Sequence, residues 1–340
     1  MPASFVAEVN LKIILLAALS LSAVFHTARA ATTVQRNNAL DSAQQAYESS
    51  DYPKAVQLLQ AAVEQNPRDA QVHLFLAKTY FELQQHDAAI ASAERAVALD
   101  PQSSLYHEWL GKAYGEKAGH AAMFSALSLA KKARREFEKA VELDERNFSA
   151  YQALIEFDCS APGIAGGGED KARPEIAKLA ALDPAEGHYA EGNCRRQKKD
   201  NATAAAEFNK ALELHPKSVE LLYDIGDHAM KHDEPAMLLV VAEQGEHLVP
   251  SDPRALFYRA VAFILKNDDA DQSERLLHEY LQRAPLRSTF PPPWRVHEWL
   301  GRLYEHQRKT QAATEEFEAS LKLEPKNKYA REALKRLKKG

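Results

Sequence analysis

A glycine-rich run at residues 161–168, with the sequence APGIAGGG, is the stretch that most invites a phosphate-binding interpretation. Such a loop also needs a strand before it and a Lys-Ser or Lys-Thr pair after its last glycine. Here the preceding residues have helical periodicity, and Gly168 is followed by Glu169 and Asp170. We therefore interpret the run as an exposed turn between helices, whose glycines permit positive backbone torsions and which is available for recognition. No cofactor is expected.

Histidine spacing raises the separate question of a metal site. His228 and His232 lie four residues apart, so a helix would place both imidazoles on one face, but the spacing suggests no third ligand. Two copies of His-Glu-Trp-Leu-Gly, beginning at His107 and His297, lack the second histidine of a zinc-protease helix. We expect no metal, and we interpret His228 and His232 as solvated residues at a hairpin end. No nucleophile, base and orienting residue can be grouped into a catalytic set, so no enzyme is expected.

The elements that carry these residues form a repeat. Pro67 and Pro101 are 34 residues apart in matching contexts, Ala-Val-Glu-Gln-Asn-Pro and Ala-Val-Ala-Leu-Asp-Pro. Each copy has two amphipathic helices, with small residues where the helices approach and a proline that ends the second helix. Apolar residues follow the helical period without strand-like alternation. We predict an all-α fold, an α-α superhelix (solenoid) of about eight hairpins with a C-terminal capping helix.

This pattern resembles the tetratricopeptide repeat over nearly all of the chain after residue 30. The clearest copy combines Trp109-Leu110-Gly111 and Tyr114 with Phe137 and Ala140. The resemblance implies a concave face, formed by the first helices, that binds extended peptides. Approximate repeats span residues 36–69, 70–103, 104–147, 148–186, 187–218, 219–252, 253–285 and 294–327, followed by a cap at 328–339. Residues 290–294, Phe-Pro-Pro-Pro-Trp, are expected to form a stiff extended connector.

Within that family, the chain is similar to a group of exported bacterial proteins with a lengthened third hairpin, an Ala-Pro-Gly-x-x-Gly-Gly-Gly turn and a following Asp-Lys-Ala. Here these features are residues 118–131, 161–168 and 170–172. The insertions lie between the two helices of adjacent copies, so we expect them to form one surface. Met123, Phe124, Leu127 and Leu129 are too apolar for a solvated protrusion, so we expect them to pack on the turn or on a partner.

Candidate partner-binding residues come from the concave face and from this insertion surface. They are Phe81, Lys112, Glu116, Met123, Phe124, Leu127, Pro162, Gly163, Gly166, Gly167, Gly168 and Tyr223. Further residues expected on the concave face are Lys78, Glu82, Glu108, Gln152, Glu156, Asp227, Arg302 and Glu305.

The two cysteines, Cys159 and Cys194, each fall near the end of a first helix in consecutive copies. Equivalent points on stacked helices are about 8–10 Å apart, a little beyond the reach of a disulfide. A bond between them and two free buried thiols are both open alternatives.

Composition and charge restrict the partner. The chain has 340 residues, 45% hydrophobic and 27% charged, with a formal net charge of −5. Such a composition folds, and the acidic balance disfavours nucleic acid because phosphate binding needs clustered Lys and Arg. We therefore expect a protein or peptide partner of unknown identity.

The N-terminus resembles a secretory signal. Lys12 precedes an apolar run from Ile13 to Phe25, and Ala28-Arg29-Ala30 forms a small-x-small cleavage site. The run is too short for a membrane span and no second run follows, so we expect no stable membrane insertion after its removal. The expected domains are a signal peptide at 1–30 and a superhelix at 31–340, in a periplasmic or secreted protein.

These features together indicate a non-enzymatic interaction scaffold or adaptor in the bacterial envelope. The alternative is an assembly factor that binds an envelope polymer or an outer-membrane machine. A third hypothesis, an enzyme that uses the glycine-rich turn, has no catalytic set to support it.

Export should leave a mature chain that begins at Ala31, because the apolar run ends at a small-x-small site. Intact-mass measurement of protein recovered from the envelope fraction of expressing cells checks this. A chain that keeps Met1, or that fractionates with the cytoplasm, would contradict it.

Overall fold

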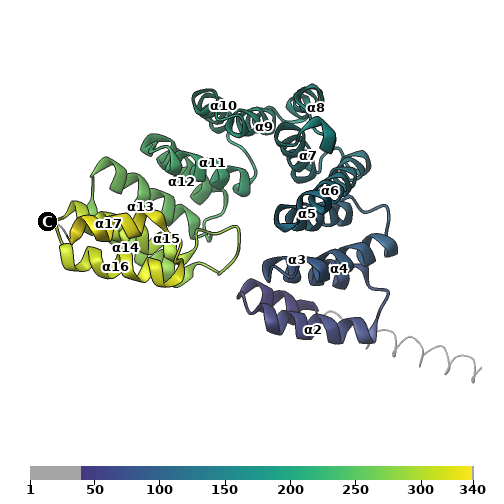
Figure 1. Ribbon diagram of the computed structural model, residues 1–340, viewed down its shortest axis with the longest axis horizontal. Helices are drawn as coiled ribbons and strands as arrows, with labels where there is room; N and C mark the ends of the chain where they lie inside the picture. The colour runs from purple at the N-terminus through teal and green to yellow at the C-terminus, as the bar shows by residue number, and fades with distance from the viewer. Residues whose placement is uncertain (1–39, 339–340) are drawn as a thin grey trace, which may run out of the picture. The chain divides into compact units, whose positions relative to one another are not determined.

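The computed structural model describes residues 40–338, and every regular element in that range is helical (Figure 1). The predicted all-α solenoid of hairpins is confirmed for this part of the chain. The predicted signal segment and residue 339 lie outside the described residues. No described helix is long and apolar enough to cross a bilayer. The chain divides into two compact units, Met1–Leu99 and Asp100–Gly340, which are treated separately below.

The described part of the first unit consists of two hairpins. Asp51 and Asp69 cap the second and third helices by accepting hydrogen bonds from backbone N–H groups of the first turn. Half of the buried apolar residues are alanines, such as Ala43 and Ala93, which allows the helices to lie close together. The helices are residues 40–48, α2 (Tyr52–Gln65), α3 (Ala70–Glu82) and α4 (His86–Leu99).

The second unit continues the hairpin pattern to a terminal helix. Its elements are α5 (Ser104–His120), α6 (Met123–Leu143), α7 (Phe148–Ser160), the short 3₁₀ helix η1 (Gly163–Ala165), α8 (Glu169–Leu182), α9 (Pro184–Gln197), α10 (Asn201–Glu213), α11 (Val219–Lys231), α12 (Pro235–Leu248), α13 (Arg254–Lys266), α14 (Ala270–Arg283), α15 (Pro293–His306), α16 (Thr310–Leu323) and α17 (Lys328–Leu337). The last helix, α17, buries Ala330 and Ala333 against the preceding hairpin.

In three hairpins of the second unit, a glycine of the first helix faces a phenylalanine of the second. A Cβ atom built on Gly111 would lie 2.6 Å from the Phe137 ring, and one built on Gly301 would lie 2.6 Å from the Phe317 ring. Gly192 faces Phe208 in the same way, at 2.5 Å. The absent side chain therefore leaves the space that the ring fills.

A histidine–glutamate contact recurs between the two helices of three hairpins. His188 contacts Glu207 and His297 contacts Glu316, in each case across 19 residues of sequence, with 2.7 Å between Nδ1 and Oε2. His107 contacts Glu136 at 2.6 Å across 29 residues. The same contact thus spans ten more residues in the α5–α6 hairpin, so the additional residues lie in the distal part of that hairpin.

The additional residues lengthen both helices of that hairpin. α5 has 17 residues and α6 has 21, whereas α7 has 13 and α8 has 14. Only Ala121 and Ala122 separate α5 from α6. The apolar tip does not pack on the glycine-rich turn, because Met123 is 77% exposed and Phe124 is 85% exposed. Leu127 and Leu129 are half-buried.

The glycine-rich turn lies beside α6. Arg134 of α6 donates to the buried carboxylate of Asp158, with Nε 2.8 Å from Oδ1, and its side chain lies against Gly166. Gly166 and Gly168 have φ values of 99° and 146°, which favour glycine. Gly167 is confined differently, since a Cβ there would lie 2.4 Å from the Ala161 carbonyl oxygen. Pro162 and Gly163 form the start of η1, where Gly163 has open space around it.

Replacing Gly111 with alanine should lower the free energy of unfolding by about 1–3 kcal/mol, because the new methyl group displaces the packed Phe137 ring. Chemical denaturation followed by circular dichroism measures the change. The matched control is Gly119→Ala on the same helix, where a Cβ meets nothing within 4 Å. That variant should be neutral or slightly more stable, and equal stability of the two variants would contradict the packing role of Gly111.

Candidate functional site

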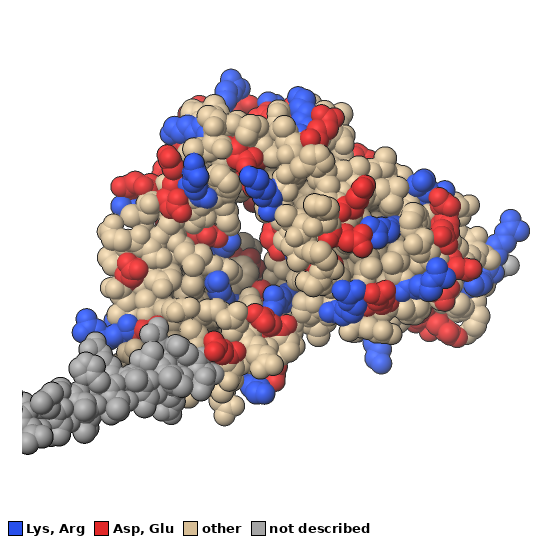
Figure 2. All heavy atoms as spheres, turned by 180° about the vertical axis from the view of Figure 1, so that it is seen from behind, with Lys and Arg blue, Asp and Glu red and all other residues tan. Residues whose placement is uncertain are grey.

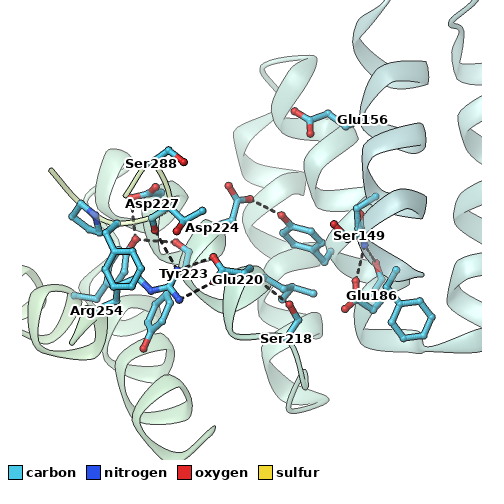
Figure 3. Close-up of a pocket in the computed structure, with 18 of the residues that line it drawn as sticks. Ser149, Glu156, Glu186, Ser218, Glu220, Tyr223, Asp224, Asp227, Arg254 and Ser288 are labelled. Atoms are coloured by element: carbon cyan, nitrogen blue, oxygen red, sulfur yellow. Dashed lines mark hydrogen bonds and ion pairs between the residues drawn. The ribbon is translucent and has the colours of Figure 1, made fainter. Parts of the chain in front are cut away.

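First helices of successive hairpins in the second unit line an open groove of about 940 Å³. Its lining comes from α5, α7, α9, α11 and α13, from the segment before α15, and from the first turn of α15 (Figure 3). The aromatic part of the lining is Phe148, Tyr189, Tyr223, Tyr258 and Phe290. Its ionisable carboxylates and cations are Glu156, Asp183, Glu186, Glu220, Asp224, Asp227, Lys112, Lys217, Arg254 and Arg295.

Several residues expected on the concave face do line this groove. They are Lys112, Gln152, Glu156, Tyr223 and Asp227. Glu116 is on α5 but outside the groove, where it contacts His120. Phe81, Lys78 and Glu82 belong to α3 of the first unit. The insertion-surface candidates, including Leu127 and Gly166, also lie outside it.

Two expected concave-face residues have a different role. Arg302 lies between aromatic rings, 4.1 Å from the Trp299 centroid and 3.6 Å from the Tyr329 centroid. Glu305 accepts from Arg336, with 3.0 Å between Oε2 and Nη2. Neither residue lines the groove, and both contact side chains of α17.

Glu108, also expected on the concave face, is only 4% exposed. Lys112 donates to it at 2.5 Å, and Ser149 and Asn147 donate at 2.8 Å and 3.0 Å. Burial alone would raise the pKa of Glu108, but the Lys112 charge and these hydrogen bonds hold it below its ordinary value. Glu108 thus holds Lys112 at the groove edge.

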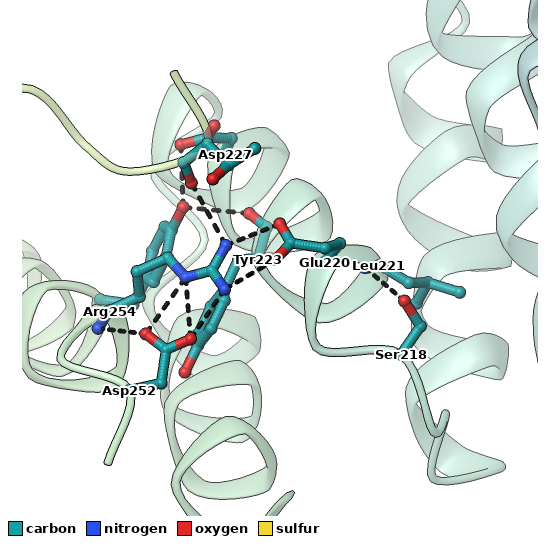
Figure 4. A network of polar contacts seen from close by, with 9 residues as sticks. Ser218, Glu220, Leu221, Tyr223, Asp227, Asp252 and Arg254 are labelled. Carbon is teal, nitrogen blue, oxygen red and sulfur yellow. Dashed lines mark hydrogen bonds and ion pairs between the residues drawn. The ribbon is translucent and has the colours of Figure 1, made fainter. Parts of the chain in front are cut away.

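Arg254 organises one wall of the groove (Figure 4). Its guanidinium donates to both carboxylate oxygens of Glu220, at 2.7 Å and 2.9 Å, and to Asp252 at 2.7 Å. It also lies 4.4 Å from the ring centroids of both Tyr223 and Phe290. Burial disfavours the charged form, but the two carboxylates raise the pKa of Arg254 overall. One buried cation therefore links α11, α13 and the segment before α15.

The segment before α15, residues 284–292, differs from the extended connector predicted at residues 290–294. The carbonyl of Thr289 accepts from Arg254 at 3.2 Å, and the carbonyl of Pro291 accepts from the Tyr280 hydroxyl at 2.8 Å. Pro293 and Trp294 are the first residues of α15. The prolines do not form a spacer, because Arg254 and Tyr280 hold the segment against the groove.

Tyrosine–aspartate contacts order the central wall. The Tyr189 hydroxyl donates to Asp224 at 2.9 Å, and the Tyr258 hydroxyl donates to Asp227 at 3.1 Å. Asp224 also forms an ion pair with Arg196, with 3.0 Å between Oδ2 and Nη2. These contacts fix two carboxylates of α11 at the groove surface.

Three groove carboxyl groups have pKa values above their ordinary range. For Glu156 the main cause is loss of solvent inside the concave wall, and the Asp224 charge adds to it. Loss of solvent also raises the pKa of Glu186, against the hydrogen bond that Gln152 donates to it. It raises the pKa of Asp227 despite the Arg295 charge 3.4 Å away. Loss of solvent is thus the main cause of the raised pKa in all three groups.

Cys159 and Cys194 form a disulfide that joins the C-terminal ends of α7 and α9. Their Cα atoms are 5.3 Å apart, within the range that a disulfide spans. The separation expected for stacked helices was too large, because these two helix ends approach closely.

His228 is buried rather than solvated, at 2% exposure, so that expectation was wrong. Its ring packs 4.9 Å from Phe208 and 4.5 Å from His232, measured between centroids. Burial lowers the pKa of His228 to about 4, so the imidazole is neutral near pH 7. Within residues 40–338, no group of three His, Cys, Asp or Glu side chains is placed to hold a metal ion.

Sequence reasoning missed much of the lining, including Tyr189, Asp224 and Arg254. Tyr189 and Asp224 lie on first helices, so the repeat register could have placed them on the concave face. Arg254 follows Asp252-Pro253 at a hairpin boundary, and the sequence carries no signal for its long-range contacts.

Family profiles described as tetratricopeptide repeat match residues 40–104 and 295–327. The chain therefore contains tetratricopeptide repeats. Proteins with these repeats generally mediate protein–protein interactions and are typically non-enzymatic scaffolds.

Solved structures with a similar fold include the tetratricopeptide-repeat protein TTC0263 from Thermus thermophilus, at 22% identity over 57% of this chain and 98% of that chain, with a TM-score of 0.46. MamA matches at 23% identity over 51% of this chain and 93% of that chain, with a TM-score of 0.39. The Cut9–Hcn1 heterotetramer of the APC/C matches at 17% identity over 88% of this chain and 55% of that chain, with a TM-score of 0.49. No curated protein matches the sequence.

Replacing Arg254 with methionine should lower stability by roughly 2–4 kcal/mol, because buried Asp252 loses its counter-charge while Glu220 stays partly solvated. Hydrogen exchange of residues 284–292 should also accelerate. Arg254→Lys keeps the charge but loses the planar guanidinium, so its stability should lie between those of the unmodified chain and Arg254→Met.

The matched control is Arg259→Met on the same helix, which removes a surface ion pair with Glu246 and should cost less than about 1 kcal/mol. Unchanged exchange of residues 284–292 in Arg254→Met would show that Arg254 does not hold this segment.

Proposed function

We propose that the chain is an exported, non-enzymatic interaction scaffold of the bacterial envelope, and that its groove holds an extended, basic segment of a partner protein. The groove itself carries this proposal. It is open along the first helices of five hairpins, and its walls offer aromatic rings and carboxylates at intervals. A partner segment can contact such walls through alternate side chains.

Charge favours a basic occupant. Of the groove cations, Lys112, Arg254 and Arg295 already contact carboxylates, and Lys217 is exposed. By contrast, Glu156 and Glu186 form no ion pair with any residue in the range 40–338. Loss of solvent on burial is the main cause of the raised pKa values of these two groups. A lysine or arginine of a partner would give each carboxylate the counter-charge that no ion pair now provides.

Export is supported by two independent features. The N-terminal pattern at residues 12–30 is that of a cleaved signal. The bond between Cys159 and Cys194 suits an oxidising compartment such as the periplasm. The alternative role, in the assembly of an envelope polymer or an outer-membrane machine, differs in the identity of the partner.

Peptides of equal length that differ only in central Lys, Glu or Gln residues test the groove. The Lys peptide should bind most tightly in fluorescence anisotropy. Glu156→Gln should weaken that peptide roughly two- to fivefold, as expected for one partly solvated charge pair. Glu318→Gln, an exposed glutamate of α16, is the matched control and should have no effect.

Equal binding of the Glu and Lys peptides would contradict a basic occupant. A photo-crosslinker at Gln152 in the groove, compared with one at Glu318, then identifies the partner in cells. A product that forms equally from both positions would argue against recognition in the groove.

A further inference from the structure

The tip of the α5–α6 hairpin, residues 117–135, combines exposed apolar side chains with an excess of positive charge. Met123 and Phe124 begin α6 and are 77% and 85% exposed. The segment contains five Lys or Arg residues and no Asp or Glu, in a chain whose formal net charge is −5. This local reversal of sign distinguishes the tip from the interspersed charges visible on the face in Figure 2.

Some cations of the tip form ion pairs within the chain, and others do not. Arg134 is engaged by Asp158 and Glu138, and His120 faces Glu116. Lys131 and Arg135 are exposed and form no ion pair with any residue between 40 and 338. Lys132 is exposed too, with its ammonium 5.0 Å from the centroid of the Tyr114 ring.

Helix geometry aims these cations at the apolar end. Lys131 and Lys132 each follow an apolar tip residue by eight positions, a rise of about 12 Å along α6. Side chains of a helix tilt toward its N-terminus, and the N-terminus of α6 is the tip. Lys131, which is exposed, can extend toward that end, whereas the Lys132 ammonium lies beside Tyr114 of α5.

We propose that the α5–α6 tip docks on an anionic lipid surface, with Met123 and Phe124 entering the headgroup layer and Lys131, Lys132 and Arg135 facing lipid phosphates. An apolar end surrounded by flexible cations is the arrangement that binds such surfaces. The contact is peripheral, since no described helix can cross a bilayer.

A lipid surface fits this tip better than an acidic protein does. The lengthened helices, of 17 and 21 residues, carry the tip past hairpins whose helices have 13 or 14. The apolar residues sit at a projecting end, with no pocket lined by Met123 or Phe124 among the principal cavities of the described chain. Stable protein interfaces bury roughly 800 Å² on each partner and are depleted in lysine.

Vesicle co-sedimentation of the chain from Ala31 onward, which retains every described residue, tests the proposal. The protein should bind vesicles of phosphatidylethanolamine and phosphatidylglycerol, and should not bind phosphatidylcholine vesicles. The Lys131→Gln, Lys132→Gln double variant should lose at least about tenfold in partition coefficient, and rising salt should weaken binding of the unmodified chain. Phe124→Asp should also abolish most binding.

The matched control is Leu323→Asp, which changes an exposed leucine of α16 and should leave binding intact. Circular dichroism verifies that each variant is folded. Because Cys159 and Cys194 are bonded to each other, Phe124→Cys introduces the single reactive thiol of a chain with two cysteines. A polarity-sensitive dye on that thiol should shift to the blue with anionic vesicles alone.

Absence of vesicle binding would overturn the proposal, and so would equal binding to both vesicle types or unchanged binding of Phe124→Asp. An acidic protein that binds the tip while anionic vesicles do not would assign the surface to a protein partner instead. The peptide measurements on the groove do not involve the tip, so either proposal can fail without the other.

Discussion

In three hairpins of the second unit, close approach of the two helices depends on a glycine that meets a phenylalanine ring. In the hairpins that contain Gly111, Gly192 and Gly301, the ring occupies the volume that a side chain would otherwise fill. Because close packing tolerates little change in volume, this contact sets the helix separation and thereby the direction of the first helix. The groove is formed by first helices, so its width follows from contacts that lie behind it.

Arg254 fixes the position of the segment between two hairpins, residues 284–292, relative to the helices. A buried guanidinium needs several acceptors, and here it finds them on Glu220, Asp252 and the Thr289 carbonyl. The result is one strongly compensated cation in a groove whose carboxylates include Glu156, which forms no ion pair with any residue in the range 40–338. This uneven distribution of charge, more than the net charge of the chain, is the basis for the proposed basic occupant.

The repeat period predicted the hairpins. It also grouped Lys112, Gln152 and Tyr223, which line the groove, because one helix determines which of its own residues share a face. The repeat period could not predict contacts between elements that are distant in sequence. The contact of Arg302 with Tyr329 of the expected capping helix was not predicted, because helix periodicity does not determine which side chains meet across two helices. The segment at 290–294 was interpreted as a spacer because prolines report local stiffness and not the Arg254 contact that holds their neighbour. His228 was expected in solvent because polar character alone does not reveal burial against Phe208.

The bond between Cys159 and Cys194 has a mechanical consequence. When the two ends of a repeat array are pulled apart, the force passes through every hairpin along the chain. A hairpin that unfolds under this force normally releases its residues as extended chain. Here the bond carries the tension directly from α7 to α9, so residues 160–193 are shielded from it. About 120 Å of extended chain is thereby withheld. The glycine-rich turn, although exposed, belongs to the part of the array that stretching cannot unravel.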